Sequence, residues 1–140
     1  MARIQLIDDD DAFRRMLRQV LEREGYQVEE ASDGLKGLQH YRAAPTDLII
    51  TDILMPEQEG LETIRRLREE HPEAKIIAIS GGGWKGTLDF LPLAKRFGAQ
   101  HTLWNPFPRE RLLDAVHALL EHQPPRGARM TTNAADDDPG

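Results

Sequence analysis

Apolar and polar positions follow two different patterns along the chain. Short apolar segments recur at residues 4–7, 48–50 and 76–79, and each stops at a polar or acidic residue. Such segments are typical of strands that are buried on both faces of a sheet. Between them, apolar residues recur at intervals of three and four, which is the stripe of an amphipathic helix. The pattern therefore predicts strands and helices in alternation.

Five strand-then-helix units can be placed in this way. The predicted strands are 4–7, 26–31, 48–52, 76–79 and 100–105. The first two predicted helices are marked by apolar stripes. In the first helix the stripe is Phe13, Met16, Leu17, Val20 and Leu21, and in the second it is Leu35, Leu38 and Tyr41. The other three helices are predicted over about 58–70, 87–97 and 108–122. Gly25 ends the first helix, Ser32 or Asp33 caps the second, and Pro92 lies inside the fourth, where it disfavours a regular helix. This order predicts an α/β fold, a five-stranded parallel sheet covered by helices on both faces.

The chain of 140 residues has the size of one domain. From residue 123 onward the composition changes to Pro, Gly, Ala, Thr, Asn and Asp without an apolar period. We therefore expect one domain over 1–122 and a disordered tail over 123–140.

Composition excludes several classes of protein. The absence of cysteine excludes disulfides and cysteine-based metal or redox sites. No segment approaches the roughly 18 apolar residues that span a bilayer, and the N-terminus does not resemble a signal peptide, so we expect a cytoplasmic protein with no membrane partner. A net charge of −6 disfavours a nucleic-acid partner. Arg14, Arg15 and Arg18 are interpreted as a solvated helix face.

Polar side chains follow four of the predicted strands. They are Asp8, Asp9 and Asp10 after the first, Asp52 at the end of the third, Ser80 after the fourth, and Asn105 after the fifth. Ligands of open parallel sheets bind beyond the carboxyl ends of the strands. The sequence therefore predicts one site, built from these residues, at one edge of the sheet.

The chemistry of these residues suits a hard cation and a phosphoryl group. Converging carboxylates without a neighbouring cation repel one another, and an all-oxygen ligand set suits Mg²⁺. A carboxylate can attack a phosphoryl group as nucleophile, and a hydroxyl such as Ser80 can bind a phosphoryl oxygen. Taken singly, each residue has a simpler interpretation, since Asp10 and Asp11 can cap a helix and Ser80 can be a loop hydroxyl.

Over residues 2–122 the chain resembles the receiver domain of two-component response regulators. The resemblance rests on the acids after the first strand, on Asp47-Leu-Ile-Ile-Thr-Asp52-Ile-Leu-Met55-Pro56 with Gly60, on Ile76-Ile-Ala-Ile-Ser80, and on Asn105-Pro106-Phe107. It implies a flavodoxin-like, doubly wound sheet with strand order 2-1-3-4-5.

The resemblance also implies a role for each site residue. Asp52 would be the phosphoacceptor. Mg²⁺ would be held by Asp8, Asp9, Asp52 and the backbone carbonyl of Leu54. Ser80 would be the switch hydroxyl that binds the phosphoryl group, and Thr102 would occupy the position of the switch aromatic.

Asn105 departs from the family pattern, which has a lysine at this position. An amide can donate a neutral hydrogen bond but cannot supply the positive charge. Two interpretations stay open: a tolerated variant with weaker coupling, or a receiver whose phosphorylation is slow, altered or absent. By resemblance, the Asn105–Pro106 bond is expected to be cis.

Two further features depart from typical relatives. The glycine-rich loop 81–86 is not a Walker motif, because Gly86 follows Lys85, and we interpret it as a mobile lid from which Lys85 could supply the missing charge. Trp104 is either packed in the core, which we favour, or a partly exposed anchor for a partner. The histidines show no metal-site spacing, and His40, His71, His117 and His122, on predicted helices or at their ends, are expected to be exposed.

The resulting hypothesis is a stand-alone, non-enzymatic signalling switch. It would take a phosphoryl group on Asp52 from a histidine kinase or a histidine phosphotransfer protein. It would then signal through a downstream protein bound at the face formed by the fourth helix, fifth strand and fifth helix. The alternative is a degenerate receiver that acts as a phosphorylation-independent interaction module. An independent metal-dependent hydrolase and a DNA-binding protein are disfavoured.

Overall fold

The computed structural model describes residues 2–53, 59–80 and 91–121. Five strands form one sheet: β1 (Arg3–Ile7), β2 (Gln27–Ala31), β3 (Leu48–Asp52), β4 (Ile76–Ser80) and β5 (His101–Trp104). Five helices alternate with them: α1 (Asp11–Arg23), α2 (Gly34–Ala43), α3 (Glu59–Glu70), α4 (Leu91–Phe97) and α5 (Arg109–Glu121). The predicted order of strands and helices is therefore confirmed.

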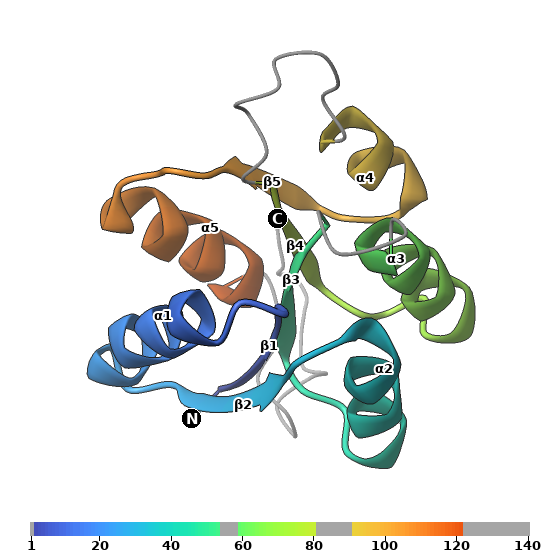
Figure 1. The fold of residues 1–140 in the computed structure, drawn as a ribbon, viewed down its shortest axis with the longest axis horizontal. Coiled ribbons are helices and arrows are strands. Elements are labelled where there is room, and N and C mark those ends of the chain that lie inside the picture. Colours follow the sequence, from blue (N-terminus) through green and yellow to red (C-terminus); the bar gives the residue numbers. More distant parts are fainter. Residues whose placement is uncertain (1, 54–58, 81–90, 122–140) are drawn as a thin grey trace, which may run out of the picture.

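All strand pairs are parallel, and their order is β2-β1-β3-β4-β5. Figure 1 shows α1 and α5 on one face of the sheet and α2, α3 and α4 on the other. The doubly wound architecture and the strand order implied by the resemblance are both confirmed.

Two hydrophobic clusters lie on opposite faces of the sheet. Successive side chains of a strand point to opposite faces, so Ile49 of β3 packs in the cluster under α2, α3 and α4, while Leu48 and Ile50 pack in the cluster under α1 and α5. All three side chains are fully buried. This burial on both faces is the physical reason why the third strand reads as a continuous apolar run.

Side-chain caps and one glycine define the ends of the first two helices. The carboxylate of Asp10 accepts from the backbone N–H of Phe13 at the start of α1, and that of Asp33 accepts from the N–H of Lys36 at the start of α2. Gly25, with a φ of 96°, follows the end of α1, where a left-handed conformation favours glycine. The predicted helix ends are confirmed here.

Some predicted features fall outside the described residues. They are the start of the fourth helix before residue 91, the loop 81–86 with Lys85, and the tail 123–140. None of the described helices is long and apolar enough to span a bilayer. His71 was predicted to be exposed and this is wrong: its ring packs edge-on against Tyr41, with centroids 4.7 Å apart, and its Nε2 is buried.

The first turn of α3 packs directly on the end of β3. A side chain at Gly60 would overlap the backbone carbonyl oxygen of Asp52 and the Cα of Ile53. These are backbone atoms of the strand that carries Asp52, so they cannot rotate away as a side chain can. Glycine at this position therefore fixes how closely α3 approaches the end of β3.

We expect Gly60→Ala to destabilise the protein by about 1–3 kcal/mol, the usual cost of overpacking. Helix propensity alone predicts the opposite sign, because alanine is the better helix former. The free energy of unfolding from urea denaturation distinguishes the two, with the exposed substitution Glu62→Ala on the same helix as a control. A Gly60→Ala protein as stable as the original would show that the contact is not tight.

Candidate functional site

The parallel sheet brings the predicted site residues to one edge. Asp8 follows β1, Asp52 ends β3, Ser80 ends β4 and Asn105 follows β5. Backbone hydrogen bonds continue across these ends, from Ile53 N–H to the carbonyl of Ile79 (2.9 Å) and from Asn105 N–H to the carbonyl of Ser80 (2.8 Å). The edge of the sheet therefore holds these residues in register.

Three carboxylates form an acidic cluster at this edge: Asp8, Asp9 and Asp52. One oxygen from each lies within 4.8 Å of the other two. Asp8 is buried, with 4% of its surface exposed, while Asp52 is half-buried and Asp9 is exposed. The cluster therefore opens to solvent at Asp9 and is closed at Asp8.

Burial raises the pKa of Asp8 from 3.8 to about 7. The hydrogen bond from the N–H of Asp10 (2.9 Å) opposes this shift, and the charges of Asp52, Asp9 and Asp10 add to it. No basic side chain among the described residues contributes to the shift. Without a bound cation, the three carboxylates therefore repel one another, and the fold keeps them close despite this repulsion.

These properties fit a divalent cation of the magnesium type. The candidate ligands are all carboxylate oxygens, which Mg²⁺ prefers, and the exposed side at Asp9 leaves room for the waters that Mg²⁺ retains. A dication would also offset the burial and the neighbouring negative charges that together raise the pKa of Asp8. Leu54, the expected source of a carbonyl ligand, lies outside the described residues.

The remaining candidates occupy the neighbouring strand ends. Ser80 is buried, and Thr102 and Asn105 are half-buried. The Asn105–Pro106 bond is cis, as expected. Trp104 is 40% exposed, so the prediction that it packs in the core is wrong. Leu103 is the buried residue of β5 instead. Successive side chains of a strand point to opposite faces, so Trp104 points away from the core.

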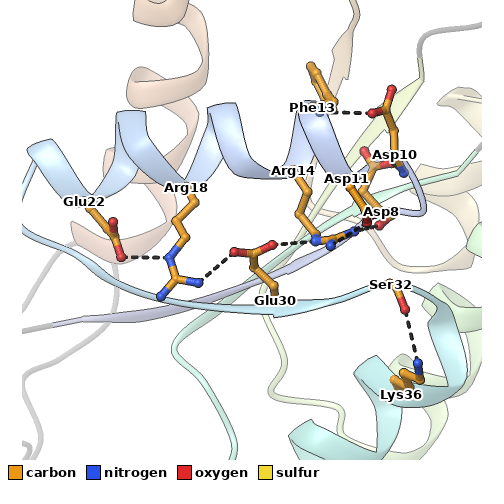
Figure 2. A network of polar contacts seen from close by, with 10 residues as sticks. All are labelled: Asp8, Asp10, Asp11, Phe13, Arg14, Arg18, Glu22, Glu30, Ser32 and Lys36. Atoms are coloured by element: carbon orange, nitrogen blue, oxygen red, sulfur yellow. Dashed lines mark hydrogen bonds and ion pairs between the residues drawn. The ribbon is translucent and has the colours of Figure 1, made fainter.

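One arginine near the site was misinterpreted from the sequence. The side chain of Arg14 is only 11% exposed and is not part of a solvated face. Figure 2 shows it between Asp11, Glu30 and the backbone of Asp8. Glu30 in the predicted second strand is the sequence feature that could have indicated a partner for Arg14. Sequence spacing alone, however, does not show that this strand lies beside Arg14.

Asp8→Asn tests the electrostatics of the cluster. An acid whose pKa is raised on folding destabilises the folded state as pH rises from 3.8 towards 7. In EDTA at pH 8, we expect the variant to be more stable than the original protein by about 2–4 kcal/mol, with the difference vanishing near pH 4.

The measurement is urea denaturation in EDTA at several pH values. The exposed substitution Asp114→Asn is the matched control and should leave the pH dependence unchanged. Identical pH dependence in the original protein and in Asp8→Asn would contradict the raised pKa.

Comparison with known proteins agrees with this arrangement. The response regulator receiver domain family matches residues 4–117. The response regulator MprA of Mycobacterium leprae is 33% identical over 126 residues, which cover 90% of this chain and 54% of that protein. The sensor kinase CckA of Brucella abortus is 33% identical over 124 residues, 87% of this chain and 13% of the kinase. The chain thus spans about half the length of the matched response regulators.

Solved structures give the same result. A response regulator receiver domain protein from Methanospirillum hungatei superimposes with a TM-score of 0.80 at 29% identity, covering 91% of this chain and 99% of that one. The receiver domain of NtrX from Brucella abortus superimposes with a TM-score of 0.77 at 27% identity, covering 86% and 99%. From the matched residues, the fold and the acidic cluster, the chain belongs to the response regulator receiver domain family of two-component signalling.

Proposed function

We propose that this receiver domain accepts a phosphoryl group on Asp52 in a Mg²⁺-dependent reaction, with a histidine kinase or a histidine phosphotransfer protein as donor. The observation that carries the proposal is the acidic cluster, in which Asp52 stands within 4.8 Å of two further carboxylates. Membership of the receiver family, whose domains are signalling modules rather than classical enzymes, supports the same function.

In this proposal the carboxylates of Asp8, Asp9 and Asp52 hold the cation, with the backbone carbonyl of Leu54 as a further ligand. When bound, Mg²⁺ supplies positive charge to the oxygens of the transferred group. The same charge keeps Asp8 ionised despite its burial, so that it can act as a ligand at neutral pH.

The transfer step needs only the side chain of Asp52 as nucleophile. A carboxylate oxygen of Asp52 forms a bond to phosphorus while the bond from phosphorus to the donor's histidine nitrogen breaks. The electron pair of the broken bond stays on that nitrogen, which can take a proton from solvent. The product is an acyl phosphate on Asp52, and no oxidant or reductant is needed.

Ser80 and Asn105 are proposed to receive the phosphoryl oxygens. The hydroxyl of Ser80 can donate to one of them from the end of β4, next to Asp52 at the end of β3. The side-chain amide of Asn105 can donate to another from the end of β5, but it brings no charge. We therefore propose that this domain is phosphorylated more slowly than it would be with a lysine at position 105.

The downstream partner is proposed to bind the face formed by α4, β5 and α5. Trp104 on β5 and Leu93 on α4 are large apolar side chains that are exposed, at 40% and 36%. A partly exposed tryptophan is a common anchor in protein interfaces. Strand alternation places Thr102 on the same side of β5 as Trp104. In this proposal, phosphorylation at the site affects the partner-binding face through Thr102.

Asn105 also favours a second candidate function. If the missing charge abolishes phosphoryl transfer, the domain acts as a phosphorylation-independent interaction module that uses the same exposed face. The two functions differ in whether Asp52 becomes phosphorylated at all.

Incubation with Mg²⁺ and acetyl phosphate, followed by intact mass spectrometry, tests the first function. We expect a mass gain of one phosphoryl group that disappears in Asp52→Asn and in EDTA, and that persists in the exposed control Asp114→Asn. If the mass does not increase with acetyl phosphate or with a phosphorylated histidine donor, the proposal that Asp52 accepts a phosphoryl group is wrong. The phosphorylation-independent interaction module is then the remaining function.

Asn105→Lys tests whether the missing charge limits the reaction. A lysine would bring an ammonium group to the developing charge, and we expect the rate of phosphorylation to rise by about tenfold or more. The measurement is the time course of phosphorylated protein by mass spectrometry at fixed Mg²⁺. An unchanged rate would mean that Asn105 does not limit transfer.

A further inference from the structure

Arg14 joins three parts of the structure beside the acidic cluster. Its Nε donates to a carboxylate oxygen of Glu30 on β2 (2.6 Å), and its Nη2 donates to the carboxylate of Asp11 (2.7 Å). Its Nη1 donates to the backbone carbonyl of Asp8 (2.5 Å). Each nitrogen of the guanidinium thus has a different acceptor, as Figure 2 shows, so the group is fixed in its plane.

Glu30 is itself held in place. Arg18, one turn further along α1, donates to its second carboxylate oxygen (2.7 Å). The hydrogen bond from Arg18, opposed by burial and reinforced by the hydrogen bond from Arg14, lowers the pKa of Glu30. Glu30 is therefore ionised at neutral pH, and its side chain, 20% exposed, is a fixed acceptor for Arg14.

The bond from Arg14 to the carbonyl of Asp8 acts on the peptide between two candidate metal ligands. A peptide group is planar, and its plane contains the Cα atoms of both flanking residues. Holding the Asp8 carbonyl in one direction therefore restrains the peptide plane from which the side chains of Asp8 and Asp9 both start. The interaction constrains the relative placement of the two carboxylates without touching either one.

Other bonds hold the two ends of the same turn. The N–H of Asp8 donates to the carbonyl of Ala31 (3.1 Å), and the N–H of Arg14 donates to the carbonyl of Asp10 (2.9 Å). The guanidinium of Arg14 adds a restraint between these ends, at the Asp8–Asp9 peptide itself.

We propose that Arg14, anchored by Glu30, is a positioning residue that orients the Asp8–Asp9 peptide and so prepares the two carboxylates for a divalent cation. The inference rests on the proposed Mg²⁺-dependent function and assigns a role to a residue outside the acidic cluster.

A purely electrostatic role and a positioning role predict opposite changes in dication affinity when Arg14 is removed. Removing a positive charge near three carboxylates should strengthen the binding of a dication. Removing a group that orients ligands should weaken it, and partners of this kind usually contribute about 10–100-fold in metal affinity. The sign of the change in affinity therefore separates the two roles.

The test is the Mg²⁺ affinity of the full chain by isothermal titration calorimetry. We expect Arg14→Ala to weaken binding by about tenfold or more. Arg14→Lys keeps the charge but loses the planar fork that reaches several acceptors at once, and it should also weaken binding. In the metal-free protein, hydrogen exchange at the Asp10 amide should be faster in both variants, because its acceptor is the carboxylate of Asp8.

Two controls separate positioning from charge and from general stability. Arg15→Ala removes the same charge from the next residue, which is exposed, and should leave the affinity unchanged or slightly tighter. Arg42→Ala removes a bidentate ion pair to Glu70 between α2 and α3, and should lower stability without changing the affinity.

The outcomes are distinct. Weaker binding in both Arg14 variants, with neither control affected, supports the inference. Arg14 variants that bind as tightly as Arg15→Ala would overturn it, while Mg²⁺ binding by the original protein and phosphorylation of Asp52 would leave the proposed function intact. An original protein that neither binds Mg²⁺ nor becomes phosphorylated would overturn the function and the inference together.

Discussion

Repulsion among three carboxylates is the constraint on which the rest of the site depends. The parallel sheet places the ends of β1 and β3 side by side, so the acids that follow these strands converge. One of them, Asp8, is buried, and burial, reinforced by the charges of the other acids, raises its pKa to about 7. Backbone hydrogen bonds at the strand ends and the guanidinium of Arg14 restrain the segments that carry these acids. A bound dication would turn this repulsion into attraction.

Much of the fold and of the acidic cluster could be predicted from the sequence. Strands buried on both faces show as apolar runs, and amphipathic helices show as stripes, so the order of the elements follows from local patterns alone. Parallel strands point their carboxyl ends the same way, which is why Asp8, Asp52, Ser80 and Asn105 could be assigned to one edge. The strand order came from the family resemblance, because local patterns do not specify which strands are neighbours.

The features that were missed depend on contacts between distant segments. The helical spacing of Arg14 suggested a solvated residue, but its partner Glu30 belongs to β2, and the pairing appears only once β2 lies beside α1. His71, directly after α3, likewise packs against Tyr41 of α2, which lies far away in the sequence. Core packing of Trp104 was favoured over partial exposure, but β5 is an edge strand whose buried position is taken by Leu103. Burial of single aromatic residues is decided by such packing and not by residue type.

The position of Glu30 has a consequence for how the protein avoids association through its sheet. β2 is an edge strand, and such edges offer unpaired backbone groups to strands of other chains. Glu29 and Glu30 are consecutive on this edge and point to opposite faces of the sheet, where Arg3 and Arg14 bind them. Charged side chains on both faces disfavour the docking of another strand. Glu30 and Arg14, which bracket the turn after β1, therefore also place charge on the exposed edge strand, where it disfavours aggregation.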